Sequence, residues 1–290
     1  MVVLVTGAMG QVGQALKEAA LSYSDTVFYF AGSAEADVTS MAALTTVFSN
    51  VKPDVCINAA AYTAVDKAES EPEKAHAINS TGAANIATVC KAFNTTLIHI
   101  STDFVFNGTK QTPYTEEDIT SPQSVYGKTK LDGEIAIEQL LKEHYIIRTS
   151  WVYSQYGNNF MKTMLRLAAE RDTVSVVNDQ TGTPTNANSL ANALITIAKY
   201  SVSNPGNPNY GIYNYSNEGE CSWYDFAKKI FEVYKINIDL QPISTEAYPT
   251  PAKRPPYSVL NKEKFKNAFN TGVDSWQDSL QNLVDKGIYN

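Results

Sequence analysis

The sequence predicts an α/β fold in which a doubly wound parallel sheet is joined to a smaller C-terminal lobe. Two observations predict it: short apolar runs alternate with segments of helical periodicity over the first 150 residues, and this regularity is lost afterwards. Continuous apolar runs are typical of strands that are buried on both faces. Their alternation with helices predicts a parallel sheet that is covered by helices on both sides.

The expected elements follow from these runs. In the first part, strands are expected over 2–6, 26–31, 54–59, 96–101 and 144–150, and helices over 11–23, 40–50, 71–93 and 127–143. Later, helices are expected over 158–171, 186–200 and 222–234, a strand over 211–216, and a last helix from Trp276. Ser222 is placed to cap the helix that follows it. We therefore expect residues 1–150 to form a nucleotide-binding domain, to which parts of 178–215 return, and residues 151–290 to form mainly the smaller lobe.

A glycine-rich turn follows the first expected strand directly. Gly7, Gly10 and Gly13 lie between that strand and the first helix. Glycines at this point allow a tight turn and let a pyrophosphate approach the backbone at a helix N-terminus. The turn follows an expected strand and precedes an expected helix, which is the context that a dinucleotide site requires. The sequence therefore predicts a Rossmann-type domain that binds NAD or NADP.

The end of the second strand bears on which dinucleotide is bound. Sites that prefer NAD usually place Asp or Glu there, against the ribose 2′-hydroxyl. This chain has Gly32 and Ser33, with no acid at the tip, which favours NADPH and leaves NADH usable. Asp37 and Val38 follow and could border the adenine; the alternative for Asp37 is to cap the next helix.

Composition restricts the class of partner. A net charge of −7 and an isoelectric point near 5.1 argue against a nucleic-acid binder. The sequence has no apolar run long enough to span a bilayer, and its start lacks the pattern of a signal peptide, so we expect a cytoplasmic protein. The three cysteines and three histidines lack the spacing of a disulfide framework or a metal site, and we expect no metal.

Polar side chains near the end of the fourth strand indicate carbonyl reduction. Thr102 and Asp103 lie there, and ligands of open α/β sheets lie beyond the carboxyl ends of the strands. Tyr126 opens the next helix and Lys130 follows one turn later, on the same face. Tyr126 could protonate a nascent alkoxide, and we expect Lys130 and a positive nicotinamide to lower its pKa from about 10. The alternative is a surface pair whose stems cover apolar neighbours.

Longer segments carry a resemblance to a known family. "TGAMGQVG", "AAAYTAVDKAE", "STDFVFNG", "YGKTKLDGE" and "TPAKRP" resemble extended short-chain dehydrogenase/reductases and, among these, the family of dTDP-4-dehydrorhamnose reductases. Phe104 departs from the tyrosine that is common there. The resemblance implies reduction of the C4 ketone of dTDP-4-dehydro-β-L-rhamnose with NADPH or NADH, the last step of dTDP-L-rhamnose synthesis.

The resemblance also implies site residues. The catalytic set would be Thr102, Tyr126 and Lys130. Together with the glycine turn, cofactor contacts are expected at Gly7, Gly10, Gln11, Val12, Gly13, Asp37, Val38, Ala61, Tyr62, Thr63, Tyr126 and Lys130. Contacts to the sugar nucleotide are expected at Thr63, Val65, Thr102, Asp103, Trp151 and Arg254. Core packing remains an alternative for Trp151, and a surface charge for Arg254. Asp66, Glu69 and Glu71 are interpreted as a solvated helix start.

Two other functions stay open at this point. The chain could reduce or epimerise a different nucleotide sugar, because the base and the hexose rest on resemblance alone. It also resembles, through "YGKTKLDGE", the regulatory subunit of methionine adenosyltransferase, which acts as a binding partner and not as an enzyme. "STD" and "AYTAVDKAE" favour the reductases. The sequence does not decide between a monomer and a homodimer.

Overall fold

In the computed structural model, which describes residues 1–206, 208–285 and 287, the centre is a six-stranded sheet. Its order is β2-β1-β3-β4-β5-β10, and all neighbouring strands are parallel. The strands are β1 (Val2–Thr6), β2 (Val27–Ala31), β3 (Val55–Asn58), β4 (Thr96–Thr102), β5 (His144–Thr149) and β10 (Gly211–Asn214). The chain crosses from β2 to β3 over β1, so the strand order changes direction beside β1, the point where open α/β sheets bind ligands.

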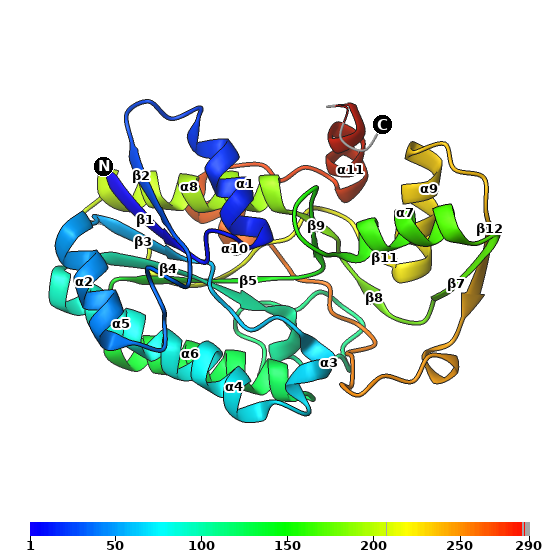
Figure 1. Ribbon diagram of the computed structural model, residues 1–290, viewed down its shortest axis with the longest axis horizontal. Helices are drawn as coiled ribbons and strands as arrows, with labels where there is room; N and C mark the ends of the chain where they lie inside the picture. The colour runs from blue at the N-terminus through cyan, green and yellow to red at the C-terminus, as the bar shows by residue number, and fades with distance from the viewer. Residues whose placement is uncertain (207, 286, 288–290) are drawn as a thin grey trace.

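Helices cover both faces of this sheet (Figure 1), which confirms the predicted fold class. One layer holds α1 (Gln11–Ala20), α8 (Ala187–Ser203) and α10 (Glu263–Phe269), and the other holds α2 (Met41–Val51), α5 (Gly82–Phe93) and α6 (Val125–Leu140). Alternate residues of a strand point to opposite faces. Accordingly, Val3 and Val5 pack into the cluster that contains α8, whereas Leu4 packs into the cluster of α2 and α5.

One expected helix is interrupted. The helical pattern over 71–93 is divided into α4 (Pro72–His76), a π-helical turn η1 (Ala77–Thr81) and α5. The proline takes the first helical position, where its missing N–H costs nothing. The short helix α3 (Val65–Ala68) precedes α4, and the 3-10 turn η2 (Asp103–Val105) follows β4. These short elements lie beside the carboxyl end of β4 and the start of α6, so they border the expected chemical centre.

A second cluster of apolar side chains forms the smaller lobe. Helices α7 (Phe160–Glu170), α9 (Trp223–Val233) and α11 (Trp276–Asp285) pack with the parallel pair β7 (Thr173–Val177) and β12 (Asp239–Ile243). Phe226 is at the centre of this cluster. Ser222 caps α9 and accepts a hydrogen bond from the N–H of Asp225, as predicted. The remaining elements are the strand pairs β6 (Val152–Tyr153) with β9 (Thr185–Asn186) and β8 (Thr181–Gly182) with β11 (Cys221–Ser222), and the turn η3 (Thr245–Ala247).

The second half of the chain also contributes to the sheet layers. Besides α8 and β10, helix α10 packs there, because Phe265 and Phe269 lie in one cluster with Tyr145 of β5 and Tyr213 of β10. The smaller lobe therefore takes fewer of residues 151–290 than the sequence pattern suggests. The division near residue 150 stays a prediction about independent domains.

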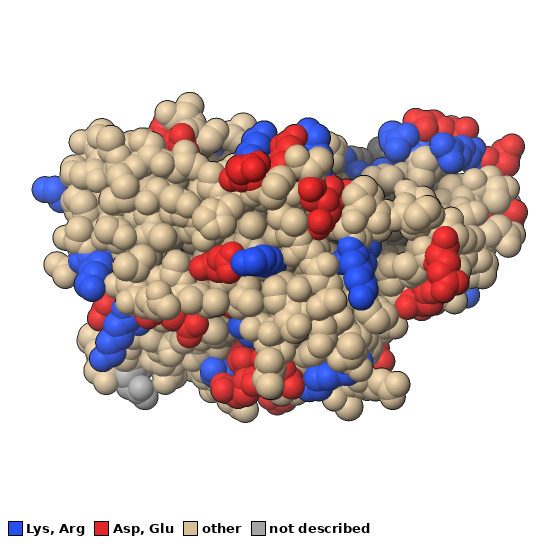
Figure 2. Space-filling model, turned by 90° about the horizontal axis from the view of Figure 1, so that it is seen from below, with Lys and Arg blue, Asp and Glu red and all other residues tan. Residues whose placement is uncertain are grey.

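The surface shows no concentration of basic charge on the face that carries α4, α5 and α6. Figure 2 views the molecule from this side, and Lys and Arg side chains alternate there with Asp and Glu. Within the described residues, no helix combines the length and the apolar character needed to cross a bilayer.

Candidate active site

The glycine turn packs onto the ends of two strands. Gly7 has a φ of +67°, and a Cβ at this position would lie 2.5 Å from the backbone of Ala59 and Ala60. A Cβ on Gly13 would lie 2.5 Å from the Gly7 carbonyl oxygen. Gly10 precedes α1 without any side-chain cap, so the first N–H groups of α1 are available at its positive end. The turn fits the pyrophosphate of a dinucleotide.

Gln11 joins the start of α1 to the smaller lobe. Its Oε1 accepts hydrogen bonds from Ser154 Oγ, at 3.0 Å, and from Asn159 Nδ2, at 2.9 Å. Asn159 also caps α7. Val12, the next residue, packs against the apolar cluster on this face of the sheet. The side chain of Gln11 therefore holds the two lobes together, and its backbone remains with the glycine turn.

The tip of the second strand differs from the expectation. Glu35 Oε2 accepts a hydrogen bond from the Gly32 N–H at 3.1 Å, so an acid does lie at the end of β2. Asp37 does not cap α2, because Ser40 does so, by accepting from the Ala43 N–H. Asp37 instead accepts from the backbone and hydroxyl of Thr39, at 2.9 and 2.8 Å. Val38 is buried, and a Cβ on Gly82 would lie 2.7 Å from one of its methyl groups.

Thr102, Asp103 and Tyr126 come together at the carboxyl end of β4. Thr102 Oγ1 donates to Asp103 Oδ1 at 3.0 Å. Burial raises the pKa of Tyr126 to about 12; hydrogen bonding with Thr102 acts the other way, and the charge of Asp103 adds to the rise. Burial also raises the pKa of Asp103 to about 6, against the hydrogen bonds of Ser258 and Thr102. The site therefore holds a phenol that is protonated at neutral pH.

Lys130 does not lower the pKa of Tyr126 as expected. Its Nζ donates to the Ile100 carbonyl at 2.6 Å and lies 3.2 Å from His99 Nε2. The lysine is only 2% exposed, which makes the surface-pair alternative wrong. Burial lowers the pKa of Lys130 to about 8, and the nearby Glu134 opposes this shift.

Two glycines let α6 approach its neighbours. A Cβ on Gly127 would overlap the carbonyl of Phe104, and one on Gly133 would overlap the carbonyl of Asn79. Ser124 caps the helix by accepting from the Gly127 N–H at 3.1 Å. This close approach packs α6 against η2, which directly follows β4, and against η1. The Phe104 ring meets the Tyr126 ring edge-on, at 5.6 Å between centroids.

Asn79 borders the candidate site, and the sequence did not indicate it. It lies in the π-helical turn η1, a feature that is frequent at functional sites. Its Oδ1 accepts from the Tyr62 N–H at 2.8 Å, and its Nδ2 donates to the Tyr62 carbonyl and to Thr129 Oγ1. The segment of Ala61, Tyr62 and Thr63 is thereby held to α6. Thr63 is exposed and Ala61 is partly buried.

The acidic residues interpreted as a solvated helix start are partly exposed, and each also has a structural partner. Asp66, on α3, binds Arg254 through two hydrogen bonds of 3.0 and 2.7 Å. Glu69 accepts from the Val125 N–H at 2.8 Å, directly before Tyr126. Glu71 accepts from the Tyr62 hydroxyl at 2.9 Å.

Trp151 and Val65 lie at the borders of this region. Trp151 has a φ of +46° and stacks on Trp223, with 3.5 Å between ring centroids. Gly182 lies against its indole, where a Cβ would approach to 2.5 Å. Trp151 is therefore a half-buried stack on the smaller lobe, while Val65 opens α3 beside Asp66 and Arg254.

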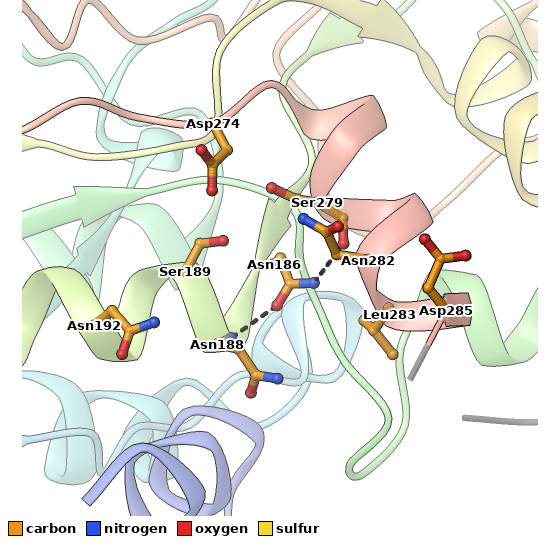
Figure 3. A pocket seen from close by; sticks show the side chains of 9 residues that line it. All are labelled: Asn186, Asn188, Ser189, Asn192, Asp274, Ser279, Asn282, Leu283 and Asp285. Carbon is orange, nitrogen blue, oxygen red and sulfur yellow. Dashed lines mark hydrogen bonds between the residues drawn. The ribbon is translucent and has the colours of Figure 1, made fainter. Parts of the chain in front are cut away.

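A separate hollow of about 360 Å³ lies between α8 and α11. Asparagine, serine and aspartate side chains line it, among them Asn188, Asn192 and Asp285 (Figure 3). None of the predicted site residues lines it. Among the described residues, no three His, Cys, Asp or Glu side chains gather as a metal would require.

The comparisons agree over nearly the whole chain. The family model described as RmlD substrate binding domain matches residues 1–288. A dTDP-4-dehydrorhamnose reductase from Sinorhizobium fredii is 43% identical over 284 residues, or 97% of this chain and 95% of the relative. The solved structure of such a reductase from Clostridium acetobutylicum has a TM-score of 0.93 at 39% identity and covers 99% of both chains. The structure of the Bacillus anthracis reductase in complex with NADP has a TM-score of 0.91 at 36% identity, covering 98% of this chain and 99% of that one. The chain therefore belongs to the dTDP-4-dehydrorhamnose reductase family.

Proposed function

We propose that this protein reduces the C4 ketone of dTDP-4-dehydro-β-L-rhamnose to dTDP-L-rhamnose. The observation that carries the proposal is the meeting of Thr102 and Tyr126 at the carboxyl end of β4, beside a buried lysine and at the same edge of the parallel sheet as the glycine turn. The full-length relatives bear the name of this activity, which supports the choice of substrate. A regulatory, non-catalytic role has no observation in its favour.

The glycine turn and the segment 61–63 are proposed to hold the cofactor. The uncapped N-terminus of α1 provides N–H groups and positive potential for a pyrophosphate. NADPH or NADH, when bound, supplies the hydride that reaches the ketone carbon. Gly10, Gln11 and Val12 would lie along the pyrophosphate, and Asp37 and Val38 near the adenine end. Glu35, at the tip of β2, is placed to meet the ribose that distinguishes the two dinucleotides.

Tyr126 is proposed as the proton donor. Because burial holds the pKa of Tyr126 near 12, the phenol keeps its proton at neutral pH and can give it to a stronger base. The ketone oxygen becomes such a base when its carbon receives the hydride, so one hydride and one proton convert the ketone into the alcohol. Thr102 would hydrogen-bond the same oxygen and fix its orientation.

The sugar nucleotide is proposed to bind between α3, Trp151 and the segment around Arg254, where Pro251, Pro255 and Pro256 lie. Arg254 offers a bidentate donor that suits a diphosphate, and it must leave Asp66 to do so. Trp151 would contribute its half-buried indole, and Asp103, Thr63 and Val65 would border the sugar. Residues 1–150 with the returning segments would form the cofactor-binding part, and the smaller lobe would bind the nucleotide.

The test is a direct assay. Purified protein is mixed with dTDP-4-dehydro-β-L-rhamnose and NADPH or NADH, and the absorbance at 340 nm is followed. Loss of absorbance with formation of dTDP-L-rhamnose, and its abolition in Tyr126→Phe, is expected. Turnover only with another 4-keto nucleotide sugar would assign the chain to a different substrate. We also place the activity in the cytoplasm, where cell fractionation should find the protein; sedimentation analysis will decide between a monomer and a homodimer.

A further inference from the structure

A chain of buried polar side chains runs beneath Lys130 across three strands. Thr6 of β1 donates from Oγ1 to Asn58 Oδ1 at 2.7 Å. Asn58 Nδ2, on β3, lies 2.9 Å from His99 Nδ1, on β4. His99 Nε2 lies 3.2 Å from Lys130 Nζ. Each of the four side chains is at most 2% exposed, so their hydrogen bonds must be satisfied within the protein.

The backbone decides which way these hydrogen bonds run. The N–H of Ala60 donates to Asn58 Oδ1 at 3.1 Å. A backbone N–H cannot accept, so exchanging the oxygen and nitrogen of this amide would place two donors against each other. Asn58 therefore presents its Nδ2 to His99. It follows that His99 Nδ1 accepts, and that the proton of the neutral imidazole is on Nε2.

The proton on Nε2 points at Lys130. An ammonium group has three donors and no lone pair, so a charged Lys130 would face another donor at 3.2 Å. A neutral amine has one lone pair. It can accept from His99 and still donate to the Ile100 carbonyl, 2.6 Å away. The geometry thus matches the neutral lysine.

Burial acts in the same direction. It lowers the pKa of Lys130 to about 8. It also lowers the pKa of His99 well below the ordinary value, with smaller contributions from the charges of Lys130 and His144. His99 therefore does not take a second proton in place of the lysine.

Charged groups on the neighbouring elements do not reverse this preference. Glu134, one turn further along α6, raises the pKa of Lys130, but its carboxylate is already bound by Arg148 of β5, with Nη2 at 2.7 Å, and by Ser101 of β4. His144 of β5 lies 2.6 Å, through its Nδ1, from the Leu141 carbonyl. Asp103 of η2 acts on Tyr126.

On the elements that cover the start of α6, the titratable groups have other partners. Glu69, after α3, bonds the Val125 N–H. Glu71, before α4, bonds Tyr62.

We propose that His99 is a positioning residue, oriented by Asn58 and the Ala60 N–H. It holds Lys130 while this lysine is a neutral amine, and the contact is lost when the amine of Lys130 takes up a proton. The proposal deepens the proposed function, on which it rests for the role of Lys130. Protonation and position are coupled, because an ammonium loses its contact with His99 and keeps only the Ile100 carbonyl. Lys130 is then a group that takes up a proton near neutral pH and turns toward Tyr126 and the cofactor, in place of a permanent charge.

The test measures the protonation of Lys130 in the ligand-free protein. Protein labelled with ¹⁵N-lysine is titrated, the Nζ chemical shift is followed by NMR, and the signal is assigned by its loss in Lys130→Met. His99→Phe removes the opposing N–H without adding charge. We expect the midpoint of Lys130 to move upward by about one pH unit, a tenfold change in the equilibrium. If His99 Nε2 accepted a hydrogen bond from a charged Lys130, the midpoint would move down in His99→Phe. If His99 only filled space, the midpoint would stay. Either result would make the proposal fail.

Asn58→Asp gives a second reading if His99→Phe does not fold. A carboxylate can accept from the Ala60 N–H and from His99 Nδ1–H, which turns Nε2 into an acceptor for an ammonium. The Lys130 midpoint should again rise by about one unit or more. Asn85→Asp on α5 is the matched control: it adds the same charge at a residue whose side chain bonds the Val38 carbonyl, and it should not move the midpoint. If Asn58→Asp and Asn85→Asp shifted the Lys130 midpoint equally, the added negative charge alone would explain the shift, and the proposal would be overturned. Because no substrate is present, a failed reductase assay would leave this result unaffected.

Discussion

Relative to the wild type, a protein without Lys130 should be more stable at neutral pH than at alkaline pH. The pKa of Lys130 falls from 10.5 to about 8 in the fold, and one pKa unit corresponds to about 1.4 kcal/mol. A lysine whose pKa is depressed destabilises the native state wherever the unfolded chain holds the proton. This penalty is fully present below about pH 8 and disappears as the pH rises toward 10.5. At pH 7 the penalty is about 3 kcal/mol, and at pH 9.5 it is about 1 kcal/mol.

The measurement is the free energy of unfolding in urea, followed by circular dichroism. Lys130→Met loses the hydrogen bond to the Ile100 carbonyl at every pH, so the useful quantity is the difference between the variant and the wild type at two pH values. From pH 7 to pH 9.5 this difference should move by about 2 kcal/mol in favour of the wild type. Lys128→Met is the control, because Lys128 lies on the exposed side of α6. The difference in free energy of unfolding between Lys128→Met and the wild type should be the same at both pH values. A constant difference for Lys130→Met as well would refute the depressed pKa.

Three further outcomes are expected. Tyr126→Phe should lower kcat by about 10²–10⁴-fold with its fold and NADPH affinity preserved, because only the transferable proton is lost; near wild-type turnover in this variant would remove the phenol from the mechanism. Arg254→Ala should raise the KM for the sugar nucleotide and leave NADPH binding unchanged. Asp66→Asn should not raise this KM, because it removes the carboxylate that competes with the diphosphate for Arg254. Unchanged kinetics in both variants would make the pair purely structural. An acid at the tip of β2 usually favours NADH, so Glu35→Gln should raise the ratio of kcat/KM for NADPH to kcat/KM for NADH; a ratio that stays constant would show that the Glu35 carboxylate does not contact the ribose.

Local signals in the sequence determined the elements and the placement of the main chemical groups. The apolar runs and glycine turn depend on neighbouring residues only, so strands such as β1 and the cap at Ser222 were predicted from short windows. The spacing of Tyr126 and Lys130 placed both on one face of α6. Which of these groups act as catalytic and binding residues came from the resemblance, and those roles stay predictions.

Only the tertiary structure decided the environment of these groups. Asn58 and His99 are 41 residues apart, and Asp66 and Arg254 are 188 apart; no local pattern marks residues as partners when they meet only through the order of the strands and the return of the tail. A lowered pKa was predicted for Tyr126 from the positive charges expected near it, because the burial of the phenol is not visible in the sequence. In the folded chain burial dominates, raising the pKa of Tyr126 and lowering that of Lys130, since removal from water disfavours the charged form of either group.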